Sequence, residues 1–305
     1  MEDAALLFYA GLSVLVLAGL AVWRGIYLIN KFTFRDLKKL FLKIEEYDKE
    51  GIGVLINVAA ENCRSEKEAG FLLRSYFLIL SILNGSGGMK NGHISVKPSS
   101  FVLSGWPAEK KKEKFEAALS QLADFAGKRN RRVWLDEERS ADEEWVEPVK
   151  RALVCDRGIT NLSWRIRCYR RDAFRRITEY VNWHKQGASF SIGLCRGAYP
   201  EDGELDENET AENILRCARL LADNSIDCVI ASHTAIKPIT NAKSGTFSLH
   251  MLHGREEVDT ALKSILVKEL AKSRGVYMIY GRSLRSLLPY VLRRLLEKPA
   301  LFWTQ

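Results

Sequence analysis

Ionisable and tyrosine side chains gather at, or just after, the ends of the predicted β-strands. The group comprises Lys97, Asp136, Arg165, Arg167, Arg196, Tyr199, His233, His250 and Tyr280. Arg165 and Arg167 stand two positions apart in one strand, which places both on the same face. Guanidinium groups inside a protein need an anion beside them, because an unpaired buried charge is too costly. Each residue alone could be a solvated loop charge or a structural partner, but the joint pattern favours a polar site.

The last predicted helix adds a second cationic group. Tyr290, Arg293 and Arg294 share one face of this helix, because residues three and four positions apart are neighbours there. Two guanidinium groups on one face suit bidentate capture of a carboxylate. A basic surface helix would carry the same pair, and the Arg-Arg pair alone favours that simpler interpretation.

Apolar, β-rich runs alternate with amphipathic stretches along the chain. The expected strands are residues 54–58, 93–97, 132–136, 162–169, 189–195, 227–232, 246–252 and 276–280. Strands that alternate with helices pair in parallel through right-handed crossovers. Eight such units predict an α/β fold of the (β/α)8 TIM-like barrel type, whose reactive groups lie at the carboxyl ends of the strands. A doubly wound open sheet is the alternative, although no G-x-G-x-x-G motif follows the first strand.

The N-terminus departs from the globular composition of the rest. Residues 4–23 carry no charge and are long enough to cross a bilayer as one helix. Glu2 and Asp3 precede this run, whereas Arg24 and Lys31 follow it. A cleaved signal peptide would need a basic leading region, so a transmembrane anchor is favoured over that and over a buried core helix. The positive-inside rule then places the main domain on the cytoplasmic side.

These patterns divide the chain into an N-terminal membrane anchor with its juxtamembrane segment, residues 1–30, and a barrel domain, residues 31–305. The net charge of +8 would fit nucleic acid, an anionic membrane surface or an acidic substrate. The cations are spread over many predicted helices without a basic stripe interleaved with aromatics, which disfavours nucleic acid. None of the six cysteines forms a C-x-x-C pair, so we expect no metal site and a reducing compartment.

Six segments, in register with the predicted strand ends, resemble the proline dehydrogenase family. They are residues 94–97 (ISVK), 135–138 (LDEE), 194–199 (LCRGAY), 231–234 (ASHT), 247–254 (FSLHMLHG) and the C-terminal stretch from Tyr280 through 290–294 (YVLRR) to Pro299. The similarity runs from about Phe34 to Gln305. The resemblance implies a monofunctional flavoenzyme of proline catabolism, which oxidises L-proline to 1-pyrroline-5-carboxylate. FAD would accept the hydride and pass electrons to a membrane quinone, with the anchor holding the barrel at the lipid bilayer.

The resemblance also implies a role for each matching position. Tyr280 and Asp136 would be the catalytic residues. Residues expected to bind the substrate, with the two arginines clamping its carboxylate, are Lys97, Tyr290, Arg293 and Arg294. Residues expected to contact FAD are Arg167, Arg196, Gly197, Ala198, His233 and Thr234.

Some positions depart from the family pattern. Gly193 stands where the family usually carries an arginine close to the flavin, and Arg167 stands where it carries a glutamine. One hypothesis is relocation, in which Arg167 supplies the missing positive charge and Gly193 leaves room for it. The opposing hypothesis is decay, because Ser248, His250 and Thr234 also differ. The chain would then be a diverged member acting on another cyclic amine acid, or a non-catalytic membrane-tethered binding protein.

Overall fold

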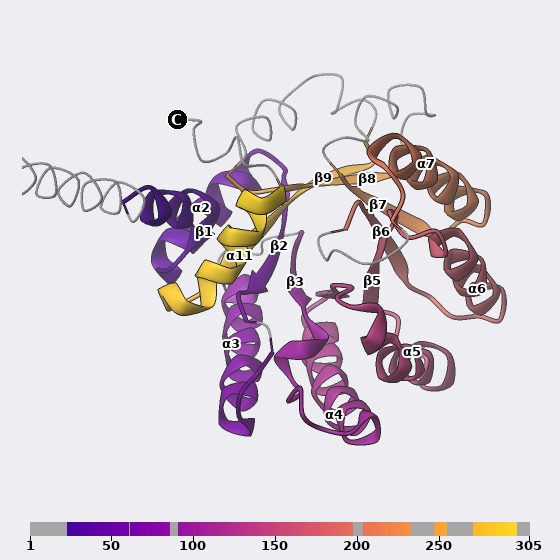
Figure 1. The fold of residues 1–305 in the computed structure, drawn as a ribbon, viewed down its shortest axis with the longest axis horizontal. Coiled ribbons are helices and arrows are strands. Elements are labelled where there is room, and N and C mark those ends of the chain that lie inside the picture. Colours follow the sequence, from indigo (N-terminus) through magenta and orange to yellow (C-terminus); the bar gives the residue numbers. More distant parts are fainter. Residues whose placement is uncertain are drawn as a thin grey trace, which may run out of the picture.

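Parallel strands close into a barrel that is surrounded by helices (Figure 1). The computed structural model describes residues 23–60, 62–85, 91–197, 204–232, 247–254 and 271–297. The barrel strands are β2 (Gly53–Val58), β3 (Gly92–Val96), β4 (Val133–Leu135), β5 (Leu162–Arg167), β6 (Ser191–Cys195), β7 (Asp227–Ala231), β8 (Ser248–Leu252) and β9 (Ser273–Tyr280). Pairing of β8 with β9 closes the sheet. The predicted (β/α)8 barrel is therefore confirmed, and the open doubly wound sheet is excluded.

Helices alternate with the strands and cover the outside of the barrel (Figure 1). They are α2 (Leu37–Lys49), α3 (Glu66–Gly85), α4 (Ala108–Gly127), α5 (Glu143–Arg151), α6 (Ala173–Lys185), α7 (Glu207–Asp223) and α11 (Leu284–Glu297). Short turns of helix, η1 (Pro98–Ser100) and η2 (Ser140–Asp142), follow β3 and β4, and η3 (Ala152–Asp156) extends α5. A two-residue strand, β1 (Thr33–Phe34), pairs with the last two residues of β9.

The main hydrophobic core lies between the strands and the helices. Outward-facing Ile94, Leu135 and Trp164 are buried there, and the Trp164 ring lies 5.1 Å from that of Tyr180 on α6. Burial of one such large side chain stabilises the fold by about 1.5–3 kcal/mol. This layer makes the barrel a rigid frame, so side chains at the strand ends hold fixed positions.

The chain enters the barrel through a helix over residues 23–32. Leu28, Ile29 and Phe32 belong to a small cluster with Ile279 of β9 and Leu287 of α11. The predicted anchor, residues 4–23, lies outside the described residues except for its last position and stays a prediction. Within the described ranges, no helix combines the length and apolar character needed to cross a bilayer.

Candidate functional site

Side chains from three different strands meet around one carboxylate inside the barrel. Asp136 directly follows β4, and its Oδ1 lies 3.1 Å from Arg165 Nε of β5. The Ser95 hydroxyl of β3 donates to Oδ1 at 2.7 Å, and the Tyr277 hydroxyl of β9 donates to Oδ2. Burial, and next the charge of Asp136, raise the pKa of Tyr277 well above its usual value. Tyr277 is therefore a protonated hydrogen-bond donor to Asp136 at physiological pH.

Two glycines make room for large side chains in the barrel interior. Arg165 and Gly193 are direct partners in the β5–β6 register. A Cβ atom on Gly193 would lie 3.1 Å from Arg165 Cγ and 3.2 Å from Trp134 Cζ3. A Cβ atom on Gly275 would lie 2.7 Å from the His250 ring. Small residues opposite large ones are the usual way to fill a narrow barrel, so Trp134, Arg165 and His250 occupy space that these glycines leave.

This arrangement corrects one part of the relocation hypothesis. The space beside Gly193 was expected to hold Arg167, but the structure gives it to Arg165. The physical reason is register, because Arg167 pairs with Cys195 and lies one pleat further along the strand. The arginine that occupies the space beside Gly193 is therefore Arg165.

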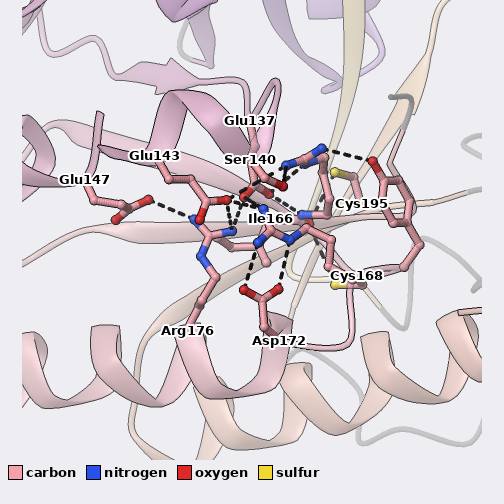
Figure 2. Close-up of polar contacts among 12 residues, drawn as sticks. Glu137, Ser140, Glu143, Glu147, Ile166, Cys168, Asp172, Arg176 and Cys195 are labelled. Carbon is pink, nitrogen blue, oxygen red and sulfur yellow. Dashed lines mark hydrogen bonds and ion pairs between the residues drawn. The ribbon is translucent and has the colours of Figure 1, made fainter. Parts of the chain in front are cut away.

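Arg167 belongs to a buried ion-pair network between β4, β5, α5 and α6 (Figure 2). Its Nε lies 3.5 Å from Glu137 Oε2, and its Nη1 donates to the Tyr169 hydroxyl at 3.0 Å. Only 1% of its side chain is exposed. Carboxylates thus balance the charge of Arg167 inside the protein, which explains how a guanidinium group is tolerated there.

Two more arginines share the carboxylates of this network. Arg170 pairs with Glu143, and Arg176 pairs with Glu137 and Glu147 (Figure 2). Burial alone would lower the pKa of Arg176, but Glu137 and the other anionic partners outweigh it and raise that pKa. The network holds the loop after β4 against α5 and α6, and it thereby fixes Asp136 at the start of that loop.

A cavity of about 120 Å³ opens next to the Asp136 cluster. Its lining comes from the carboxyl ends of β2, β3 and β9 and from the start of α3 and of α11. The lining residues are Asn57, Ala59, Ala60, Arg64, Glu68, Lys97, Ile279, Ser283, Ser286 and Tyr290. Ser95 connects the cavity to the cluster, because its carbonyl accepts from Asn57 while its hydroxyl donates to Asp136. Lys97 and Tyr290, two of the residues expected to bind the substrate, both line this cavity.

The turn after β3 sets the position of Lys97. Pro98 occupies the first position of η1, where a missing N–H group costs nothing. The Glu138 carboxylate then accepts hydrogen bonds from both the backbone N–H and the hydroxyl of Ser99, each at 2.8 Å. The strand therefore ends in a rigid turn, and Lys97 is held at the wall of the cavity with only 7% of its surface exposed.

Comparison with known proteins agrees with this geometry. The family model described as "Proline dehydrogenase" matches residues 41–301. This chain belongs to the proline dehydrogenase family. The expectation of a proline dehydrogenase-type oxidoreductase is thereby confirmed at the level of the family. No curated protein matches the sequence.

Solved structures of proline utilization A share the fold. The protein from Bdellovibrio bacteriovorus, inactivated by N-propargylglycine, has a TM-score of 0.74 and 19% sequence identity, over 88% of this chain and 32% of its own. A mutant of the Bradyrhizobium japonicum protein has a TM-score of 0.68 and 20% identity, over 83% and 29% respectively. This member of the proline dehydrogenase family thus spans about a third of the length of those proteins.

Tyr280 does not join the site as the sequence predicted. Successive strand residues point to opposite faces, so Tyr280 faces away from Tyr277, and it is buried in the core shared with the helices. Arg282 Nε donates to its hydroxyl at 3.2 Å. Tyr277 takes the place next to Asp136 instead. Alternation along β9, with Gly275, Tyr277 and Ile279 on one face, was the signal that could have identified it.

Several predicted residues fall partly or wholly outside the described structure. Ala198, His233 and Thr234 lie outside the described residues, and so do the side chains of Arg293 and Arg294 on α11. Their predicted roles stay predictions.

The two remaining predicted FAD contacts are described. Arg196 is exposed directly after β6. Gly197 has a φ of +126°, and a Cβ atom there would lie 1.6 Å from the Tyr169 ring. Packing against Tyr169 therefore requires a glycine at this position, independently of any contact with FAD.

Buried polar atoms in the barrel interior fit a flavin ring. Trp134 Nε1, Arg165 Nη2 and His250 Nδ1 have no hydrogen-bond partner within the described part of the chain. Burial, and next the charges of Arg165 and His93, lower the pKa of His250 to about 3, so this ring is neutral at physiological pH. A ring system whose edge carries both acceptors and donors would satisfy such atoms.

Proposed function

We propose that this protein binds FAD at the mouth of the barrel and oxidises L-proline to 1-pyrroline-5-carboxylate in proline catabolism. The observation that carries the proposal is the cavity in which Lys97 and Tyr290 meet beside the Asp136 cluster. Membership of the proline dehydrogenase family supports the reaction class. Hydride transfer needs a bound acceptor, because amino-acid side chains supply none, and FAD would provide it here.

The cavity offers complementary surfaces to a small cyclic zwitterion. Lys97 supplies positive charge for the carboxylate, and Arg293 and Arg294 would add the clamp that the family resemblance implies. Ala59, Ile279 and the Tyr290 ring are apolar surfaces for the methylene groups of the substrate. Holding a substrate in one orientation, away from water, is the main way in which a protein accelerates such a transfer.

The Asp136 cluster would hold one wall of the site. Asp136 keeps Tyr277 and Arg165 in place through direct contacts. Arg165, Trp134 and His250 would contact the flavin edge from the barrel interior, since their polar atoms lack partners within the described part of the chain. Arg167, Arg196, Gly197, Ala198, His233 and Thr234 would form the remainder of the cofactor site, as the family resemblance implies.

The decay hypothesis loses part of its support from the position of Ser248. Ser248 is the first residue of β8, and Ser273 Oγ donates to its hydroxyl at 2.7 Å. It therefore lies at the amino end of the barrel, remote from the carboxyl ends where barrel enzymes place their reactive groups. A diverged substrate, or a non-catalytic binding role, remains the second candidate function because Gly193 and His250 depart from the family pattern.

The electron acceptor and the location are part of the same proposal. We propose that electrons pass to a membrane quinone, with residues 1–30 anchoring the barrel on the cytoplasmic face of the lipid bilayer. The uncharged run over residues 4–23 supports the anchor. Recovery of the full-length protein in the membrane fraction is the expected result, and recovery entirely in the soluble fraction would refute the anchor.

One spectroscopic experiment tests the enzymatic function. Purified full-length protein is expected to show a flavin absorbance band that L-proline bleaches in the absence of oxygen. Lys97→Met should keep the band and lose most of the response to proline, whereas Lys272→Met, at an exposed ion pair, should behave as wild type. A yellow protein that proline does not bleach would indicate another substrate. A colourless protein that still binds proline would indicate the non-catalytic role.

A further inference from the structure

The cavity contains one buried acceptor that the described protein leaves unused. Asn57 lies near the end of β2, is only 1% exposed and lines the cavity. Its Nδ2 donates to the Ser95 carbonyl at 2.9 Å. A carbonyl oxygen can only accept, so this contact fixes the orientation of the amide, with Nδ2 towards β3. The other amide atom, Oδ1, has no hydrogen-bond partner among the described residues.

The neighbouring donors on β2, β3 and α3 are already engaged. The backbone N–H of Val58 donates to the Tyr76 hydroxyl at 3.2 Å, and that hydroxyl donates to the Ser95 carbonyl at 2.9 Å. The Ser95 hydroxyl donates to Asp136. Leaving a buried acceptor unsatisfied is costly, so a donor for Asn57 Oδ1 is expected to come from the cavity itself.

We propose that Asn57 Oδ1 accepts a hydrogen bond from the ring ammonium group of the substrate and so selects a secondary amine acid over a ligand without that N–H. The inference rests on the proposed function and adds a specificity-determining residue to the same cavity. Lys97 and Asn57 both line the cavity. Lys97 would bind the carboxylate of a zwitterion, and Asn57 would accept from its ammonium group. A neutral amide oxygen receives the ammonium without cancelling the charge of Lys97.

The contact between Asn57 and the ammonium group is tested by measuring the affinities of two ligands for the wild type and for one variant. The ligands are L-proline and tetrahydrofuran-2-carboxylate of the same chirality, in which a ring oxygen replaces the ammonium group. Calorimetry gives both dissociation constants for the wild type and for Asn57→Leu, which is close in size and lacks the acceptor. A hydrogen bond to a charged donor is worth about 1.5–3 kcal/mol, so the preference for proline should fall at least tenfold in the variant. Effects that act equally on both ligands cancel.

The controls separate this inference from the proposed function. Ser286→Ala also changes the cavity wall, but the Ser286 hydroxyl donates to the Ser283 carbonyl at 2.8 Å, so its ligand preference should match that of the wild type. If Asn57→Leu does not fold, Asn57→Ala provides the measurement, because Tyr76 still donates to the Ser95 carbonyl. An unchanged preference in the variant that folds would mean that a buried water satisfies Oδ1, and the inference would be wrong. Failure of the wild type to bind either ligand would instead refute the proposed function.

Discussion

Replacing Arg165 by methionine should lower the free energy of unfolding more than the loss of an exposed ion pair does. The Arg165 side chain is 9% exposed and that of Asp136 is 12% exposed, with 3.1 Å between Nε and Oδ1. Arg165→Met keeps the apolar stem beside Trp134 and Gly193, and it removes the charge alone. The variant therefore leaves the Asp136 carboxylate buried without its cation.

The size of the effect follows from the remaining partners of Asp136. Removing one member of a buried ion pair typically costs about 3–5 kcal/mol, because the other charge stays buried. Ser95 and Tyr277 still donate to the carboxylate, so we expect the lower end, about 3 kcal/mol. Asp136→Asn should cost a similar amount, because it leaves the Arg165 charge buried. The double variant carries neither charge, so it should be more stable than the two losses added together predict, by about 2 kcal/mol.

Urea unfolding, followed by far-ultraviolet circular dichroism, measures these free energies of unfolding. Lys272→Met is the matched control, because Lys272 and Asp227 form an ion pair whose side chains are 59% and 58% exposed. Exposed pairs contribute about 0–1 kcal/mol, so the control should unfold almost as the wild type does. A loss below 1 kcal/mol in Arg165→Met, or strict additivity in the double variant, would show that Arg165 and Asp136 are not coupled inside the barrel.

Three further predictions concern acid stability, a helix cap and a glycine. Burial, and next the nearby arginines, lower the pKa of His93 to about 4 and that of His250 to about 3, from 6.5. Between pH 4 and pH 6.5 the two rings therefore bind more protons in the unfolded chain than in the folded protein. The free energy of unfolding should fall on acidification from pH 6 to pH 4. These two rings contribute up to about 2.7 kcal/mol per pH unit to that fall. His250→Gln should remove about half of that contribution in urea titrations at several pH values, and an unchanged slope would contradict it. Asp206→Ala removes the capping box of α7 and should lower the free energy of unfolding by about 1 kcal/mol; hydrogen exchange in the first turn of α7 that stays as slow as in the wild type would oppose this. Gly197→Ala should cost at least about 2 kcal/mol, because the φ of +126° and the Tyr169 ring both exclude a Cβ atom, and a melting temperature equal to that of the wild type would speak against the packing described.

Local sequence patterns determined the barrel and most of its polar residues. Short apolar runs separated by helical stretches were enough to locate all eight barrel strands, because burial on both faces demands continuous β-branched and aliphatic residues in parallel strands. Lys97 and Asp136 were identifiable because charged residues directly follow such runs. These signals depend on neighbours in the chain, and they do not require knowledge of which strands pair.

The tertiary structure alone decided which side chains meet. The choice of Tyr277 over Tyr280 depends on the phase of the pleat in β9, where a shift of one residue reverses the face. The choice of Arg165 over Arg167 depends on its register with Gly193, a partner 28 positions away. Side chains from several strands fill the interior of a barrel together. Whether one of them fits therefore depends on residues that are close in space but distant in the sequence.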